Sequence, residues 1–304
     1  MYQIRVFKVV FLRLPEQIER TQPGKVTEIV IRRNPPRTRR RPAHLQEFEI
    51  ENMEEKLQTC IDFCYRAVCD IPQTYQDAIT STKSRQWKNA MDKEMRSLEE
   101  NKTFTLTQLL PGKQPVGGRW VYTLKRDIDG SEKYKARFVA KGYSQKLGTD
   151  YEETFSSTAD MTSVRVVMQK AAQENLILHQ MDVETAYLHA PIDCEIYMEQ
   201  PEGYEQKSET GEKLVCKLEK SLYGLKQSGR NWNAMLHVCL IENDFTQNPA
   251  DNCVYTKEKH DEKVILTVWV DDLIIAANSE SVLKSVKGML TERFKMKDMG
   301  RLKH

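Results

Sequence analysis

The sequence predicts an α+β fold, in which helices pack against strands. Three observations lead to this prediction. An apolar stripe with helical spacing lies near residue 90, a hairpin pattern occupies residues 118–145, and two later strand-like segments each carry aspartate at one end. Helical and strand segments that follow one another in this way are typical of a mixed α and β domain.

The first predicted element is a helix in SRQWKNAMDKEMRSLEENKTF. Its apolar residues recur at intervals of four, four and three, and charged residues lie on the opposite face: Trp87, Met91, Met95 and Leu98. We interpret this stripe as core packing.

A hairpin is predicted next, because the strand-like runs WVYTLKR and YKARFVAKG flank Asp129 and Gly130. Its strands are rich in cations: Lys125, Arg126, Lys133, Lys135, Arg137 and Lys141. Such a charge run indicates either a solvated face or a clamp for phosphates.

Two segments then place carboxylates at strand ends. After a predicted helix around Val164, Val167 and Ala171, the run from Leu176 to Val183 has strand composition and ends next to Asp182. A lone aspartate there is usually a cap or turn residue. Between the two segments, SLYGLKQSG predicts a loop and Trp232 begins another apolar helical face.

The second segment, WVDDLIIAAN, sets Asp271 and Asp272 between two apolar runs. An ordinary hairpin turn explains the pair, since aspartate is favoured in turns. A metal site explains it as well, because ionised carboxylates near a core need cations or donors. If a sheet brings Asp182 beside this turn, the three carboxylates can converge on hard divalent cations.

Composition limits the remaining choices. The net charge is only +2, and basic character is concentrated in RRNPPRTRRRP, residues 32–42, which cannot build a packed core. We therefore expect residues 1–70 to be a basic, disordered leader or linker. Seven scattered cysteines and the absence of a signal peptide or membrane span lead us to expect a cytoplasmic or nuclear protein.

Five motifs in one order resemble the reverse transcriptase of Ty1/copia-type retrotransposons. They are WKNAMDKEM, YKARFVAKGYSQ, HQMDVETAYLHA, KSLYGLKQSGRNW and WVDDLIIA. The resemblance covers roughly residues 71–304 and implies the fingers and palm of a polymerase right hand, with an antiparallel palm sheet backed by helices. The family continues further into a thumb and ribonuclease H, so we expect the thumb to be absent from this chain.

The resemblance also implies roles for individual residues. It makes Asp182, Asp271 and Asp272 the catalytic carboxylates that hold two Mg²⁺ ions, with Mn²⁺ as an alternative. It places Tyr187 under the incoming sugar as the gate against a 2′-hydroxyl, and Gln227 in a loop that contacts nucleotide and template. Lys125 and Arg137 are its best candidates for triphosphate contacts, with Arg126 and Lys135 as alternatives.

The sequence therefore predicts an RNA- or DNA-templated DNA polymerase that acts on deoxynucleoside triphosphates and a primed template, without a membrane. Its oligomeric state is left open. The rival interpretation is an inactive remnant of a retroelement that acts at most as a nucleic-acid-binding module. A third is a hairpin-rich scaffold without metals, in which Asp271 and Asp272 would point into solvent far from Asp182.

Overall fold

The computed structural model describes residues 71–126 and 130–302, which belong to one compact unit. The predicted leader, residues 1–70, lies outside them. The helices of this part of the chain are α2 (Tyr75–Thr80), α3 (Ser84–Glu100), α4 (Met161–Gln173), α5 (Ala186–His189), α6 (Ser228–Glu242) and α7 (Glu280–Arg293), with a 3₁₀ turn, η2, at Gly142–Ser144. The strands are β1 (Phe104–Thr107), β2 (Gly118–Arg126), β3 (Glu132–Ala140), β4 (Ile177–Val183), β5 (Tyr197–Met198), β6 (Val215–Leu218), β7 (Thr246–Asn248), β8 (Asp251–Lys259), β9 (Glu262–Trp269), β10 (Asp272–Ala277) and β11 (Met296–Arg301).

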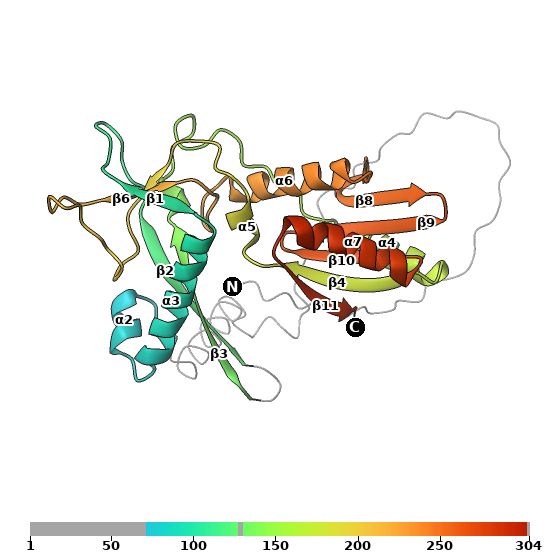
Figure 1. The fold of residues 1–304 in the computed structure, drawn as a ribbon, viewed down its shortest axis with the longest axis horizontal. Coiled ribbons are helices and arrows are strands. Elements are labelled where there is room, and N and C mark those ends of the chain that lie inside the picture. The colour runs from blue at the N-terminus through green and yellow to red at the C-terminus, as the bar shows by residue number, and fades with distance from the viewer. Residues whose placement is uncertain (1–70, 127–129, 303–304) are drawn as a thin grey trace, which may run out of the picture. The chain divides into compact units, whose positions relative to one another are not determined.

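The largest sheet has six strands in the order β11-β4-β10-β9-β8-β7, and every neighbouring pair in it is antiparallel (Figure 1). Strands β8, β9 and β10 follow one another along the chain and form consecutive hairpins. Strand β4 comes from much earlier in the sequence and lies between β10 and β11. Helices and strands are thus mixed, which confirms the α and β composition predicted from the sequence.

Helices pack on both faces of this sheet. Because side chains alternate along a strand, register assigns each residue to a face. Lys287 of α7 contacts His179 of β4, so α7 covers the face that His179 occupies. On the other face, α4 forms a small core cluster with Ile265 and Ala276. Asp182 and Asp272 share this second face with α4 but lie at the opposite end of the strands.

Strands β2 and β3 form a separate two-stranded sheet, with Lys125 opposite Lys133 near the turn. One face of the hairpin is aromatic and apolar and packs on α3. At its centre Trp87 is fully buried, with its ring 5.4 Å from that of Tyr122 and 4.7 Å from that of Tyr134. These contacts confirm both the predicted helix and the predicted hairpin. Asp129 of the turn lies outside the described residues.

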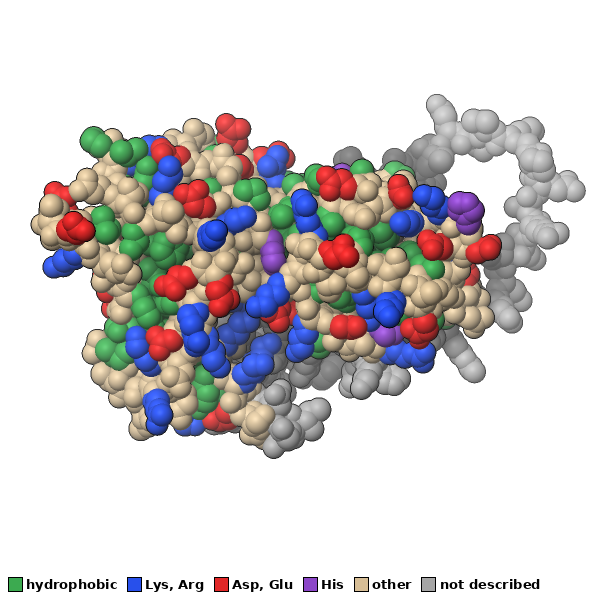
Figure 2. Space-filling model, in the orientation of Figure 1, with side chains coloured by type: hydrophobic (Ala, Val, Ile, Leu, Met, Phe, Trp, Pro, Cys, Tyr) green, Lys and Arg blue, Asp and Glu red, His purple; other side chains and the backbone are tan. Residues whose placement is uncertain are grey.

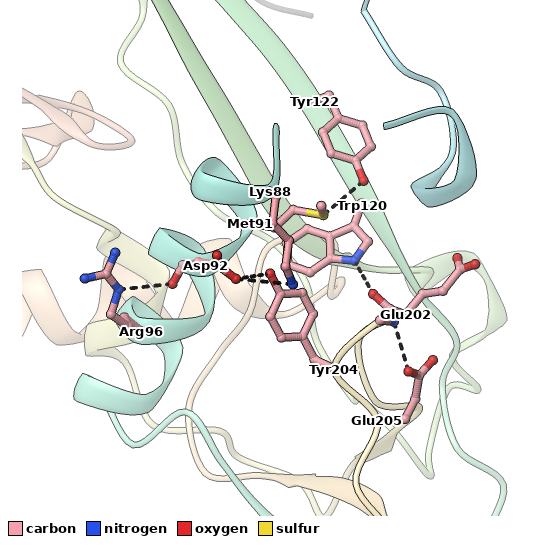
Figure 3. A network of polar contacts seen from close by, with 10 residues as sticks. Lys88, Met91, Asp92, Arg96, Trp120, Tyr122, Glu202, Tyr204 and Glu205 are labelled. Atoms are coloured by element: carbon pink, nitrogen blue, oxygen red, sulfur yellow. Dashed lines mark hydrogen bonds and ion pairs between the residues drawn. The ribbon is translucent and has the colours of Figure 1, made fainter. Parts of the chain in front are cut away.

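A third sheet has the strand order β1-β6-β5, and a loop at residues 201–206, between β5 and β6, packs against α3 and β2. Figure 3 shows its polar contacts. The Trp120 indole donates a hydrogen bond of 3.0 Å to the backbone carbonyl of Glu202. The ring of Tyr204 lies between the ammonium of Lys88, 4.0 Å from its centroid, and the ring of Trp120, 5.8 Å away. Its hydroxyl donates to Asp92 at 2.5 Å. The loop is therefore anchored by an aromatic and ionic network of its own.

Candidate active site

The register of the six-stranded sheet brings the predicted carboxylates together. Asp272, the first residue of β10, lies directly opposite Asp182 of β4, and both side chains project from the same face. Directly opposed residues have their Cβ atoms about 4.5–5.5 Å apart. Asp271 precedes Asp272 in the two-residue turn between β9 and β10. The register therefore places Asp182 beside the turn that carries Asp271 and Asp272, whereas the scaffold interpretation expected Asp182 to lie far from that turn.

The turn that carries Asp271 has an unusual backbone. Val270 has φ of 55°, a conformation that β-branched residues rarely adopt and that costs about 1–3 kcal/mol. Two hydrogen bonds hold it. The indole of Trp232, on α6, donates to the Val270 carbonyl at 2.8 Å, and the backbone N–H of Val183 donates to the Asp271 carbonyl at 2.8 Å. These bonds attach the turn to α6 and to β4, which fixes Asp271 relative to Asp182.

Burial raises the pKa of all three carboxyl groups. For Asp271 the pKa rises to about 6, because burial and the nearby charges of Asp182 and Asp272 outweigh the attraction of Arg137 and Lys135. Burial is also the main cause of the raised pKa of Asp182. Asp272 accepts a hydrogen bond of 3.1 Å from the Gln180 amide, which opposes the effect of burial on its pKa. Burial therefore disfavours the ionised form of all three carboxyl groups, which a bound cation would restore.

The basic face of the β2–β3 hairpin lies toward these carboxylates. Register places Lys125, Lys133, Lys135 and Arg137 on the face opposite the aromatic one. The charges of Lys135 and Lys125 lower the pKa of Asp182, and the charge of Arg137 lowers that of Asp271. Figure 2 shows Lys and Arg side chains gathered between the hairpin and the side of the large sheet where β11 lies. The predicted triphosphate residues Lys125 and Arg137 are thus near the carboxylates, as is the alternative Lys135. The Arg126 side chain lies outside the described residues.

Two further charged residues belong to this region, and sequence reasoning did not select them. Lys297 of β11 pairs with Asp182 across the sheet, and its charge also lowers the pKa of Asp182. Glu94 of α3 is 9% exposed and accepts a hydrogen bond of 3.3 Å from the backbone N–H of Phe138, next to Arg137. Glu94 thereby binds the outer edge of β3. Only the three-dimensional pairing of elements identifies both residues.

Tyr187, the predicted sugar gate, lies in the short helix α5, one residue after its first residue Ala186 and just after β4. Burial raises the pKa of its hydroxyl, and the neighbouring charge of Asp271 raises it further. Its ring lies 4.8 Å from that of Tyr223. Tyr187 is therefore next to the carboxylates, and its action on a sugar stays a prediction.

Gln227 is differently placed. Its side chain is completely buried, and its amide is already hydrogen bonded. The carboxamide oxygen accepts from Gln145 at 3.0 Å, and the amide nitrogen donates to the Asp150 carbonyl at 2.8 Å. A contact between Gln227 and a nucleotide stays a prediction, but in this structure the amide links the start of α6 to the segment after β3.

The three carboxylates suit a hard divalent cation, since all their donors are oxygen atoms and burial disfavours their charge unless a cation stabilises it. Within residues 71–126 and 130–302, no group of three His, Cys, Asp or Glu side chains is already gathered closely enough to hold a metal ion. The residues present therefore fit a metal by their chemistry and their shared position, while the structure shows no coordination geometry.

Comparisons with known proteins identify the family to which the chain is similar. A family model described as reverse transcriptase (RNA-dependent DNA polymerase) matches residues 101–304. The chain is 40% identical over 232 residues to the retrovirus-related Pol polyprotein from transposon TNT 1-94 of Nicotiana tabacum, covering 75% of this chain and 17% of that protein. It is 38% identical over 223 residues to the Pol polyprotein from transposon RE1 of Arabidopsis thaliana, covering 73% of this chain and 15% of that protein. With the Ty1-NL2 Gag-Pol polyprotein of Saccharomyces cerevisiae it shares 30% identity over 233 residues, or 73% of this chain and 13% of that protein.

The chain thus spans less than a fifth of the length of these curated relatives. Among the described residues, no helix is long and apolar enough to cross a membrane. The family match includes four of the five motifs noted in the sequence in full, together with all three carboxylates and the basic hairpin. The chain therefore belongs to the reverse transcriptase (RNA-dependent DNA polymerase) family, and its relatives are Pol polyproteins of Ty1/copia-type transposons.

Proposed function

We propose that this chain adds deoxynucleotides to a primer on an RNA or DNA template. In this proposal the six-stranded sheet is the palm of a right-hand polymerase, and the β2–β3 hairpin with α3 forms its fingers. The observation that carries the proposal is the register of Asp182 opposite Asp272, with Asp271 in the adjoining turn and a basic hairpin face directed toward them. This arrangement provides carboxylates for cations and cations for phosphates.

Asp182, Asp271 and Asp272 would hold two Mg²⁺ ions, or Mn²⁺ in their place. Bound magnesium supplies charge stabilisation for the oxygens of a phosphoryl transfer. The protein contributes by positioning. The hydrogen bonds from Trp232 and Val183 hold the backbone of the Asp271 turn in place, so the carboxylate side chains would adjust around a fixed backbone when the ions bind.

The basic hairpin face would receive the triphosphate. Lys125, Lys135 and Arg137 can donate charge-assisted hydrogen bonds to phosphate oxygens and neutralise their charge. Tyr187 would lie beneath the sugar and exclude a 2′-hydroxyl by a clash. The primer 3′-hydroxyl would attack the innermost phosphate, the bond between that phosphate and the next would break, and pyrophosphate would leave.

The cysteines support an intracellular site of action. Cys194, Cys216, Cys239 and Cys253 are all free. Free thiols are typical of reducing compartments, so we place the protein in the cytosol or nucleus.

Primer extension tests the proposal. The full chain, supplied with a primed template, deoxynucleotides and a titration of Mg²⁺, should extend the primer in a magnesium-dependent manner. Asp271→Asn preserves shape and removes one charge, and should reduce the rate by roughly a thousandfold, because metal-based stabilisation is worth several kcal/mol. The matched control is Asp261→Asn, which removes an exposed aspartate from the β8–β9 turn at the other end of β9.

The rival interpretation predicts a different result. A remnant that only binds nucleic acid would retain the primed template in a salt-dependent manner and incorporate nothing at any magnesium concentration. Equal primer extension by the parent and Asp271→Asn would show that Asp271 does not hold the metal.

A further inference from the structure

Tyr223 lies between two residues to which the proposed function gives separate tasks. It belongs to the segment that joins β6 to α6. The Arg137 guanidinium carbon lies 4.4 Å from the centroid of its ring, and the ring of Tyr187 meets it at 4.8 Å with an interplanar angle of 56°. One aromatic ring therefore contacts both the candidate triphosphate residue and the candidate sugar gate.

The backbone of Tyr223 is held firmly in place. Its carbonyl accepts a hydrogen bond of 2.8 Å from the backbone N–H of Ala140, the last residue of β3. The next residue, Gly224, has φ of 92°, and a Cβ there would lie 2.2 Å from the Ala140 carbonyl oxygen. Only glycine allows so close an approach. The segment is thus tied to the hairpin strand that carries Arg137.

The hydroxyl of Tyr223 contributes little to this arrangement. It is buried and has no hydrogen-bond partner among the described residues. Burial is the main cause of its raised pKa. The contacts that matter are consequently those of the ring: a cation–π contact with Arg137 and a tilted aromatic contact with Tyr187.

We propose that Tyr223 is a positioning residue for sugar selection, because its ring fixes Tyr187 and Arg137 in one arrangement. This inference rests on the proposed function. A tyrosine that excludes a 2′-hydroxyl by a steric clash can do so only if its own ring is held in a fixed position. If the ring of Tyr223 is removed, Tyr187 gains room to move aside, and a ribonucleotide fits.

The test compares dATP with ATP in primer extension opposite a templating thymine. Tyr223→Leu keeps an apolar side chain but removes the aromatic face. It should lower the ratio of kcat/KM for dATP to that for ATP by roughly tenfold, which corresponds to about 1.4 kcal/mol. Tyr223→Phe keeps the ring and should retain the ratio of the parent.

Tyr204→Leu is the matched control. Tyr204 also lies between a cation and an aromatic ring, in the separate network of Figure 3. Its replacement should lower thermal stability and leave the dATP/ATP ratio unchanged. A change of ratio in Tyr204→Leu equal to that in Tyr223→Leu would show a general effect of destabilisation and overturn the inference.

A double variant shows whether Tyr223 acts through Tyr187. Tyr187→Val should relax discrimination by itself, and adding Tyr223→Leu should cause little further loss, since the gate is already gone. Fully additive losses would contradict the proposed route.

A binding measurement separates this inference from the proposed function. Calorimetry with a dideoxy-terminated primer–template and Ca²⁺ measures Kd for dATP and ATP without turnover. If the parent prefers dATP in binding but extends no primer, the proposed polymerase activity fails, while a smaller preference in Tyr223→Leu still supports the inference. If the parent shows no preference, or Tyr223→Leu keeps it in full, the inference is wrong.

Discussion

Gln145 and Gln227 form a buried amide pair beside the candidate site. Gln145 donates to Gln227 and accepts from the backbone N–H of Lys226 at 2.8 Å. Replacing either glutamine by leucine leaves buried polar groups without partners, which costs about 1–3 kcal/mol. We expect Gln145→Leu and Gln227→Leu each to lower the free energy of unfolding by this amount, and the double variant to lose less than the sum. Denaturant unfolding measures all three values.

The control for this pair is Gln200→Leu. Gln200 is also buried and donates to the backbone carbonyls of Gln206 and Leu214, but it has no contact with Gln145. Its loss should be additive with that of Gln145→Leu. If Gln227→Leu also proves additive with Gln145→Leu, the two amides are not energetically coupled, and the nucleotide contact predicted for Gln227 becomes the better explanation of its presence.

Individual residues of the candidate site differ in whether the sequence alone could identify them. The three aspartates could be selected because each stands at the end of an apolar strand, where an ionised carboxylate needs a cation or a hydrogen-bond donor: Asp182, Asp271 and Asp272. Tyr223 could not, because in SLYGLKQSG it looks like any loop aromatic. Its importance comes from contacts with Arg137 and Tyr187, which lie 86 and 36 residues earlier.

At the scale of elements, the β2–β3 hairpin places like charges opposite one another. Lys125 pairs with Lys133 across the two strands, and such pairs are destabilising unless an anion lies between them. We expect Lys125→Gln to leave the stability of the free protein unchanged or slightly higher, by up to about 0.5 kcal/mol, while it raises the apparent KM for deoxynucleotides severalfold. Thermal unfolding and primer extension measure the two effects.

Lys133→Gln is the matched control for the hairpin. It relieves the same repulsion, but Lys133 is not among the charges that act on Asp182, Asp271 or Asp272. Its effect on stability should equal that of Lys125→Gln, and its effect on KM should be smaller. The opposite order of the two KM values would show that Lys133, rather than Lys125, contacts the triphosphate.

Helices and strands whose apolar residues recur at a regular spacing could be predicted from the sequence. The elements with which they pair or pack could not. The stripe of Trp87, Met91 and Leu98 repeats with helical spacing, so α3 followed from the sequence. The short strands β1, β5 and β6 carry too few residues for a period to be evident. Their pairing in one sheet joins residues more than a hundred positions apart, as with Phe104 and Leu218, which no local pattern can reveal.

At the scale of the whole molecule, stability should depend on pH through a cluster between α7 and the sheet. Lys287 donates to Nδ1 of His179 at 2.6 Å and to Asp298 at 2.7 Å. Burial, then the charge of Lys287, lowers the pKa of His179 below its ordinary value of 6.5, although Asp298 and Glu280 act in the other direction and Arg301 adds to the lowering. The folded protein therefore keeps this histidine neutral at a pH where the unfolded chain binds a proton.

The sign of the effect follows from linkage. The contribution of His179 to stability is fully present above about pH 6.5 and is lost as the pH falls through its folded-state pKa. His179→Gln can still accept from Lys287 but does not titrate. We expect the free energy of unfolding to fall less between pH 7 and pH 5 in the variant than in the parent. Because the two proteins share all other titratable groups, the difference between their pH profiles of stability gives the contribution of His179. Identical profiles would show that His179 does not contribute to the pH dependence of stability.

The strand order of the large sheet also determines when the chain can complete its fold during synthesis. Strands β8, β9 and β10 are neighbours in sequence and can pair as soon as they leave the ribosome. Strand β4 emerges far earlier, yet both of its partners, β10 and β11, lie in the last part of the described chain. Its apolar face, with Met181 and Val183, must remain uncovered while roughly ninety further residues are translated, which takes about 5–20 seconds at bacterial-to-eukaryotic rates of 5–20 residues per second. A nascent chain of this architecture therefore carries Asp182 on an unpaired strand until Asp272 is made, and the two halves of the candidate site come together only after β10 has been translated.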